Sequence, residues 1–236
     1  MDTLSNEKGL KWEFQKNTPL IIAFAGMAEN LNELNHFEFV KSTRHANCSK
    51  IYCLDAGYFW YQHGLTTPEV GSISKLVDKL KALICEAAPT HIRCIGVSAG
   101  GFAAILFGYL LKVDIVHAFG PQIFLTRELE ERYRPQIQGC DGGKYDTGEK
   151  LRIRLDSLEG VPGHVLDLEP VLRAGNGKTK FILHVGKDHK RDMVHANHIK
   201  ECLGVEIKPY NCAGHACASQ MLVQSGQLSK VILEGI

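Results

Sequence analysis

Residues 91–107 read HIRCIGVSAGGFAAILF, and this stretch decides the fold. A run of apolar and β-branched residues, typical of a buried strand, ends at Val97, and a segment rich in helix-forming residues begins almost at once. The sequence between them is G-x-S-x-G, from Gly96 to Gly100. A strand, a very tight turn and a helix in direct succession hold the hydroxyl of Ser98 clear of the sheet, which makes this serine a candidate nucleophile.

The residues around Ser98 also decide between rival interpretations of this turn. Small residues are needed at Gly96 and Gly100 because a side chain at either position would collide with neighbouring backbone. The following helix points its free N–H groups and positive dipole end at Ser98. A nucleotide-binding loop would use the same dipole, but this chain has Ser98 where a dinucleotide fingerprint needs glycine, and no Walker lysine follows. An inert structural turn is the remaining alternative.

Length, composition and charge fit an ordinary enzyme domain. The chain has 236 residues, of which 44% are hydrophobic and 22% charged, with a formal net charge of +1. We expect one domain over residues 1–236. The balanced charge gives no reason to expect nucleic acid, and the apolar runs are far shorter than the roughly 20 residues of a membrane span. Because the N-terminus is also too polar for a secretory signal, the sequence predicts a soluble, cytoplasmic protein.

The eight cysteines raise the question of disulfides or a metal. Cys53, Cys85 and Cys94 fall in apolar patterns where thiols behave as small hydrophobes, so reduced, buried cysteines are favoured. Two further cysteines flank His215 within residues 212–217, but no second half-site completes a tetrahedral zinc set. We therefore predict no metal and no organic cofactor.

Apolar runs alternate with amphipathic segments along the chain, and this alternation predicts the architecture. Strands are expected at residues 19–25, 50–56, 91–97, 114–120, 180–186 and 205–210, and helices at 30–41, 73–87, 99–111, 193–203 and 217–233. The pattern is typical of a mostly parallel sheet with helices on both faces, a three-layer α/β/α sandwich whose ligands bind at the carboxyl ends of the strands. Residues 122–178 form an excursion between two strands, either a lid-like insertion or a surface loop without a role.

Three motifs, in the order serine, acid, histidine, resemble those of the α/β-hydrolase superfamily over most of the chain, from about Pro19 onward. They are the elbow GVSAGG, the acid loop FILHVGKDHKRD and the histidine loop VEIKPYNCAGHACA. That order distinguishes the superfamily from other serine hydrolases. The resemblance implies an α/β-hydrolase fold with a small or minimal cap.

The chemistry of a serine nucleophile assigns a role to each motif. A hydroxyl needs a base within hydrogen-bond reach, and the base needs a third group to fix its tautomer. We predict that Ser98 attacks, His215 accepts its proton and Asp188 orients His215, although a surface role for His215 is the alternative. Asp192 is the competing acid. Asp188 lies nearer the strand end, whereas Asp192 is typical of the N-cap of a helix that begins near Met193.

An acyl-transfer site also needs donors for the oxyanion. One is the N–H of Ala99, directly after the nucleophile. The resemblance implies a second in the loop after the first long strand, where Gly26 permits close approach and Met27 offers its N–H. The H-G-G-G signature of lipases is absent, and a plain turn is the alternative.

Specificity residues are sought in the aromatic cluster at residues 58–63, which follows a strand and lies at the same edge as the elbow. Trp60, Tyr61 and His63 are predicted to line an acyl or aryl pocket, with Gln122 on a second wall. The competing interpretation is that the cluster packs its loop against the body of the protein.

Together, these features predict a serine hydrolase that cleaves a small-molecule carboxylic ester or thioester through an acyl-enzyme. An acyltransferase, or a peptidase or amidase, would use the same triad, and the fold does not choose among them. A non-catalytic binding protein with this fold is the alternative from a different class. The sequence gives no indication of oligomeric state.

Overall fold

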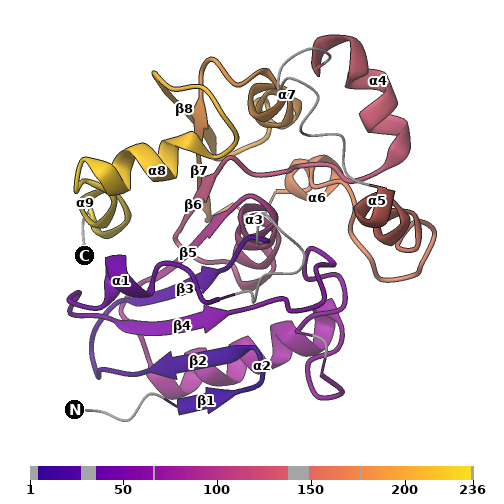
Figure 1. Ribbon diagram of the computed structural model, residues 1–236. Helices are drawn as coiled ribbons and strands as arrows, with labels where there is room; N and C mark the ends of the chain where they lie inside the picture. Colours follow the sequence, from indigo (N-terminus) through magenta and orange to yellow (C-terminus); the bar gives the residue numbers. More distant parts are fainter. Residues whose placement is uncertain (1–4, 28–35, 66, 138–148, 176, 235–236) are drawn as a thin grey trace.

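The computed structural model describes residues 5–27, 36–65, 67–137, 149–175 and 177–234. Its centre is an eight-stranded sheet in the order β1-β2-β4-β3-β5-β6-β7-β8 (Figure 1). The strands are β1 (Ser5–Glu7), β2 (Leu10–Glu13), β3 (Leu20–Phe24), β4 (Ser49–Cys53), β5 (Ile92–Val97), β6 (Ile115–Phe119), β7 (Lys180–Gly186) and β8 (Val205–Tyr210). β1 and β2 are antiparallel and β2 pairs antiparallel with β4, whereas all pairs from β4 to β8 are parallel.

Helices cover both faces of the sheet, as predicted for a three-layer α/β/α sandwich (Figure 1). One face packs on α2 (Ile73–Ala87), α3 (Ala99–Leu111) and α7 (Lys190–His198), which contribute to the larger hydrophobic core. The other face packs on α8 (Cys217–Gln224) and α9 (Leu228–Leu233), with α1 (Val40–Thr43) in contact with α9. No helix in the described part of the chain has the length and apolar character needed to cross a bilayer.

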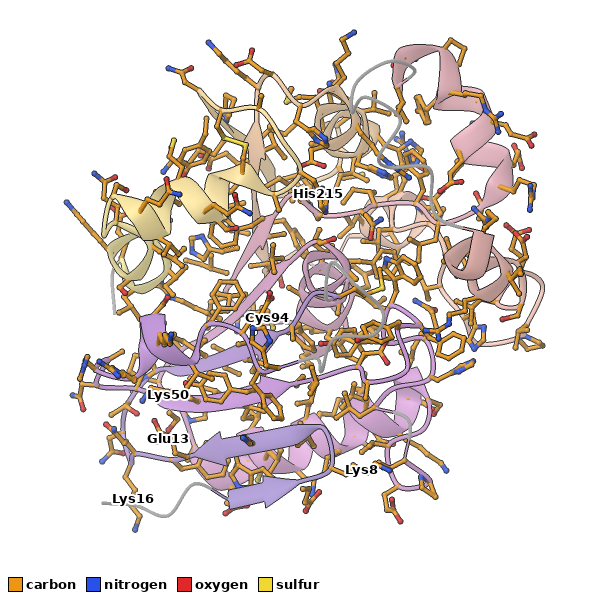
Figure 2. All side chains as sticks on the ribbon, in the orientation of Figure 1. Lys8, Glu13, Lys16, Lys50, Cys94 and His215 are labelled. Carbon is orange, nitrogen blue, oxygen red and sulfur yellow. A yellow bond between two sulfur atoms is a disulfide. The ribbon has the colours of Figure 1, made fainter. Side chains whose placement is uncertain are left out.

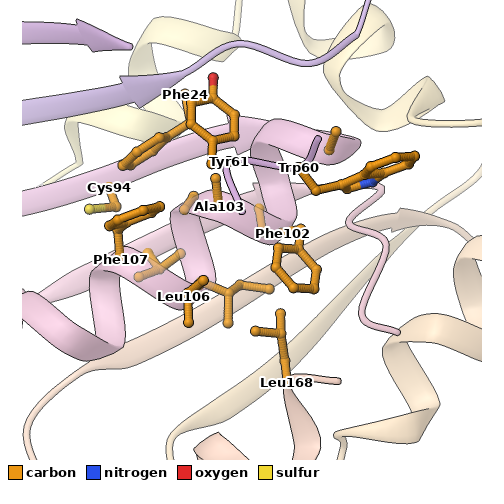
Figure 3. Close-up of a cluster of buried hydrophobic side chains, with 14 of the residues drawn as sticks. Phe24, Trp60, Tyr61, Cys94, Phe102, Ala103, Leu106, Phe107 and Leu168 are labelled. Atoms are coloured by element: carbon orange, nitrogen blue, oxygen red, sulfur yellow. The ribbon is translucent and has the colours of Figure 1, made fainter. Parts of the chain in front are cut away.

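The core on the α2–α3 face is built from aromatic and aliphatic side chains that come from distant parts of the chain (Figure 3). The ring of Phe24 stacks on that of Phe107, with centroids 5.3 Å apart, and meets Tyr61 edge-on at 5.5 Å. Elsewhere in the sheet, the buried Lys50 of β4 forms an ion pair with Glu13 of the neighbouring strand β2 (Figure 2). This pairing supplies the partner that a buried ammonium group requires.

All six predicted strands are confirmed, and so are the helices at 73–87 and 99–111. The helix expected at 193–203 instead begins at Lys190 and ends at His198. The helix expected at 217–233 is two helices, because the chain turns at Gly226, where φ is +67°. The short, polar β1–β2 hairpin was not predicted, since it lacks an apolar run. The helix expected at 30–41 falls largely on residues outside those described.

The excursion at residues 122–178 is largely helical. It contains α4 (Arg127–Ile137), α5 (Glu149–Asp156) and α6 (Glu169–Arg173). An isolated antiparallel bridge joins Phe124 to Asp167, and Leu155 and Leu158 are buried. The segment therefore packs on the body through its own apolar residues, and its role as a lid stays a prediction.

The cysteines depart from the expectation of reduced, buried thiols. Cys212 and Cys217 form a disulfide. Cys53 and Cys94 are free and buried as predicted, but Cys85 is free and exposed, because it lies on the outer side of α2. The apolar pattern around Cys85 was that of an amphipathic helix, which buries only one side.

Candidate active site

Ser98 lies at the junction of β5 and α3 in a backbone conformation that L-residues rarely adopt, with φ 53° and ψ −117°. Such a conformation costs of order 1–3 kcal/mol. A Cβ at Gly96 would lie 2.0 Å from the carbonyl oxygen of Gly100, and one at Gly100 would lie 2.2 Å from that of Phe24. The turn is therefore possible only with glycine on both sides of the serine, as the sequence predicted.

His215 reaches Ser98 from the loop that follows β8. Its Nε2 lies 2.7 Å from Oγ of Ser98, within hydrogen-bonding distance. Figure 2 labels His215 in the region where the start of α3, α7 and α8 come together. Both side chains are partly exposed, so a ligand can approach the pair. The structure thus brings together two predicted residues that are 117 positions apart.

The carboxylate beside His215 is that of Asp192, with Oδ1 2.8 Å from Nδ1 of the histidine. Asp188, the preferred acid, is exposed. The error has a local cause: α7 begins at Lys190 with His189 as its N-cap, so Asp192 is the third residue of the helix and not its cap. Because Asp192 lies in the first turn of α7, its side chain lies beneath His215 rather than at the end of β7.

Asp192 is almost fully buried, and several polar groups surround its carboxylate. Oδ2 accepts a hydrogen bond from the backbone N–H of Ala216 at 2.9 Å. Nδ1 of the buried His189 lies 3.0 Å from Oδ1 and 3.3 Å from the backbone nitrogen of Asp192. Burial alone would raise the pKa of this carboxyl, but the contacts with His189 and His215 outweigh it and hold the pKa below its ordinary value. Asp192 is therefore a buried anion.

His189 is a residue that sequence reasoning missed. Four histidines and two aspartates lie within residues 184–198, and nothing in their order indicates which of them face inward. Placing the first residue of α7 correctly would have put His189 and Asp192 one helical turn apart, on the same side of the helix.

The disulfide closes the loop that carries His215. Cys212 and Cys217 bracket the histidine, and both pack against the end of β7. A Cβ at Gly186 would lie 2.4 Å from Sγ of Cys217 and 2.6 Å from the carbonyl oxygen of Cys212. The covalent link thus closes the histidine loop on itself, and the closed loop packs against the end of the strand from which the acid loop emerges.

Two of the predicted oxyanion-hole residues, Ala99 and Gly26, lie beside the elbow. Ala99 is the first residue of α3, so its N–H is one of the free donors at the helix N-terminus. In the loop after β3, the N–H of Gly26 donates to Oε2 of Glu38 at 2.9 Å and is therefore engaged. Gly26 approaches Val97 closely, since a Cβ there would lie 2.9 Å from the Val97 carbonyl oxygen. Met27 stays the predicted second donor.

The predicted pocket residues do not form one wall. Trp60 and Tyr61 are fully buried, so the alternative interpretation, that the cluster packs its loop, is the correct one for these two rings (Figure 3). Nε1 of Trp60 donates to Oε1 of Gln122 at 2.6 Å. His63 lines a separate cavity of about 530 Å³ beside α2, together with His164. None of the described residues around that cavity flanks Ser98 or His215.

A larger cavity, of about 810 Å³, begins beside Ser98 and His215. Val97 and Ala216, the chain neighbours of Ser98 and His215, line it, and it continues between residues 36–42 and α8. We call this cavity the α8 groove. Its volume is within the range that small-molecule sites occupy.

One cluster has the composition of a metal site. Nitrogen and oxygen atoms of His189, Asp192 and His215 lie within 4.8 Å of one another. Two imidazoles and a carboxylate suit a transition-metal ion, but direct contacts of hydrogen-bond length already link Asp192 to each histidine.

The sheet order, the elbow after β5 and the converging serine, histidine and aspartate define an α/β-hydrolase fold. No protein-family model and no curated protein matches this chain. Among solved structures, the capsule O-acetyltransferase of Neisseria meningitidis serogroup A is 16% identical, with a TM-score of 0.64 over 97% of this chain and 93% of that one. A thermophilic esterase from Thermogutta terrifontis is 18% identical, with a TM-score of 0.52 over 99% and 96%. Brefeldin A esterase, a bacterial homologue of human hormone-sensitive lipase, is 15% identical, with a TM-score of 0.59 over 94% and 70%. At these identities the likeness establishes the fold.

Proposed function

We propose that this protein is a serine acyl hydrolase that cleaves an ester or thioester through an acyl-enzyme on Ser98. The observation that carries the proposal is the continuous contact from Oγ of Ser98 to Nε2 of His215, at 2.7 Å, and from Nδ1 of His215 to Asp192, at 2.8 Å. A binding protein has no need of a nucleophile, a base and a buried anion in this order.

The geometry supports a two-step reaction. His215 takes the proton of Ser98 as Oγ attacks the carbonyl carbon, and the buried carboxylate of Asp192 stabilises the imidazolium that forms. The N–H of Ala99 faces the developing oxyanion. When the tetrahedral intermediate collapses, the bond from carbon to the leaving oxygen or sulfur breaks and His215 protonates the leaving group. Water, deprotonated by His215, then attacks the acyl-enzyme and releases the acid and free Ser98.

An acyltransferase is the second candidate, in which an alcohol takes the place of water in the second step. The similarity of the fold to that of a capsule O-acetyltransferase, over nearly the whole chain, supports this second candidate. The two activities share every residue of the triad, so they differ only in the acceptor.

Labelling with a fluorophosphonate probe tests the proposal, with the modified peptide identified by mass spectrometry. Wild type should be labelled on Ser98, and Ser98→Ala should lose labelling and at least about a thousandfold of the turnover of p-nitrophenyl and thioester substrates. Ser157→Ala removes an exposed hydroxyl in the 122–178 excursion and should behave as wild type. A folded wild-type protein that is neither labelled nor active would overturn the proposal. Turnover that requires an added alcohol would select the acyltransferase.

A further inference from the structure

The α8 groove has a wall that the proposed reaction does not use. Its apolar lining comes from residues 37–40, from the strand ends and from α8 and α9, and consists of Phe37, Phe39, Val40, Leu54, Val97, Val223 and Leu228. Because it begins at Val97 and Ala216, a substrate whose carbonyl lies over Ser98 would extend one of its two ends into this groove.

The charged residues on that wall are mostly cationic. Lys11 and Lys41 line the groove together with His36 and one acidic residue, Glu38. The carboxylate of Glu38 is largely buried and accepts a hydrogen bond from the N–H of Gly26, so its charge is directed at the backbone.

Neither lysine forms an ion pair with a carboxylate of the described residues. Nζ of Lys11 lies over the ring of Phe37, 4.7 Å from its centroid, at the edge of the groove. Lys41 is exposed in α1. Elsewhere in the described chain, lysines such as Lys50 and Lys79 lie against carboxylates. The lining of the α8 groove therefore carries two lysines against one carboxylate beside Ser98, and this excess of positive charge favours an anionic ligand.

We propose that the α8 groove binds the phosphate-bearing end of the acyl substrate, with Lys11 and Lys41 as its cationic contacts. This inference rests on the proposed function, because it takes the other end of the substrate to be the carbonyl over Ser98. Two point charges on flexible stems suit the several oxygens of a phosphate. The apolar lining between them and Ser98 covers the uncharged part of the substrate. The phosphate could belong to coenzyme A in a thioester or to a sugar phosphate in an ester.

Isothermal titration calorimetry tests the groove without requiring turnover. The probes are coenzyme A, glucose 6-phosphate and pantetheine, which is the part of coenzyme A without phosphate. At least one phosphorylated probe should bind. If coenzyme A is the probe that binds, it should bind at least about tenfold more tightly than pantetheine. Raising the salt concentration from about 50 to about 200 mM should weaken the binding of the phosphorylated probe.

Substitutions assign the effect to the two lysines. Lys11→Gln with Lys41→Gln should weaken the binding of the phosphorylated probe about tenfold, whereas Lys11→Arg with Lys41→Arg should retain most of it. The matched control is Lys8→Gln with Lys16→Gln, which removes two exposed charges from the two ends of the β1–β2 hairpin (Figure 2), outside the lining of the groove, and should leave binding unchanged.

The outcomes separate this inference from the proposed function. If Ser98 is labelled by the fluorophosphonate and neither phosphorylated probe binds, or Lys11→Gln with Lys41→Gln binds as tightly as the Lys8→Gln with Lys16→Gln control, the phosphate site is wrong and the hydrolase stands. If a phosphorylated probe binds through the lysines but Ser98 is inert, the assignment of the ligand as an acyl substrate is wrong.

Discussion

Asp192 lies beneath His215, with its Oδ1 2.8 Å from Nδ1 of the imidazole, and it does so from within the first turn of α7. The acid of the candidate triad is thus held by a helix and by the N–H of Ala216 at 2.9 Å. This rigid support matters because the tautomer of His215 depends on which atom faces Nδ1.

Replacing Asp192 by asparagine should lower kcat/KM about a thousandfold to ten-thousandfold, since an amide can hold His215 in the wrong tautomer and cannot stabilise the imidazolium. Asp188→Asn is the control at the exposed aspartate and should stay within about twofold of wild type. Turnover of a p-nitrophenyl ester, with circular dichroism to confirm folding, measures both. A larger loss for Asp188→Asn than for Asp192→Asn would reverse the assignment.

His189 should be a positioning residue for Asp192. Its Nδ1 lies 3.0 Å from Oδ1 of the carboxylate and accepts a hydrogen bond from the backbone N–H of Asp192, so His189→Ala should lower kcat about tenfold because Asp192 loses both contacts. His189→Asn keeps a polar amide group near the position of Nδ1 that can still cap α7, and it should recover most of the rate. Steady-state kinetics of the two variants decide the point, with calorimetric melting to compare their stability. If both variants lose the same activity in proportion to their stability, His189 has only a structural role.

The disulfide between Cys212 and Cys217 should restrict the conformations of the loop that carries His215. Replacing both cysteines by serine opens a loop of six residues, and the chain-entropy estimate for such a loop is about 2 kcal/mol of folding stability. We also expect kcat to fall several-fold, because the loop then samples positions from which His215 does not reach Ser98. Urea unfolding and ester turnover measure the two effects.

Cys85→Ser is the matched control, since it removes an exposed free thiol on α2 and should change neither quantity. Treating wild type with a reductant should reproduce the double serine variant. Disulfides are rare in cytosolic proteins, so this pair is at odds with the cytoplasmic location expected from the sequence. A free-thiol titration that finds Cys212 and Cys217 reduced in purified protein would show that the link does not form.

The parts of the site that could be predicted from sequence are those that backbone sterics dictate. Gly96 and Gly100 admit no side chain, and a glycine-flanked serine between a strand and a helix has few other uses. Backbone sterics could not predict whether Asp188 or Asp192 faces His215, because the answer depends on where α7 begins. Moving a helix start by three residues redirects every side chain in its first turn.

The sequence also could not predict which of the aromatic side chains at this edge of the sheet are buried. Trp60 and Tyr61 are aromatic residues at the correct edge of the sheet, yet the backbone places both at positive φ and turns them into the core. The Cys212–Cys217 pair was missed for a related reason, since free and bonded thiols have the same residue type. Only the fold brings the two sulfur atoms against Gly186.

A buried histidine pair on the α8 face makes the stability of this protein dependent on pH. Nδ1 of His117 in β6 lies 3.0 Å from Nε2 of His184 in β7, and Nδ1 of His184 lies 2.9 Å from the hydroxyl of Tyr210. Burial, with nearby cationic groups, lowers the pKa of His117 to about 4 and holds that of His184 still lower. On the other face, burial lowers the pKa of His195 to about 3.

These histidines stay neutral in the folded protein and take up protons on unfolding below their ordinary pKa of 6.5. The stabilisation is therefore complete above about pH 6.5 and is lost as the pH falls toward 4, at about 1.4 kcal/mol per pH unit for each histidine. Urea unfolding between about pH 7 and pH 4.5 should show this loss. His117→Phe should reduce the dependence of the free energy of unfolding on pH by about the contribution of one histidine. His91→Gln, at an exposed position, should leave the slope unchanged. A free energy of unfolding that stays flat over this range would mean that the buried imidazoles are charged in the folded state, and that the low pKa values assigned to them here are wrong.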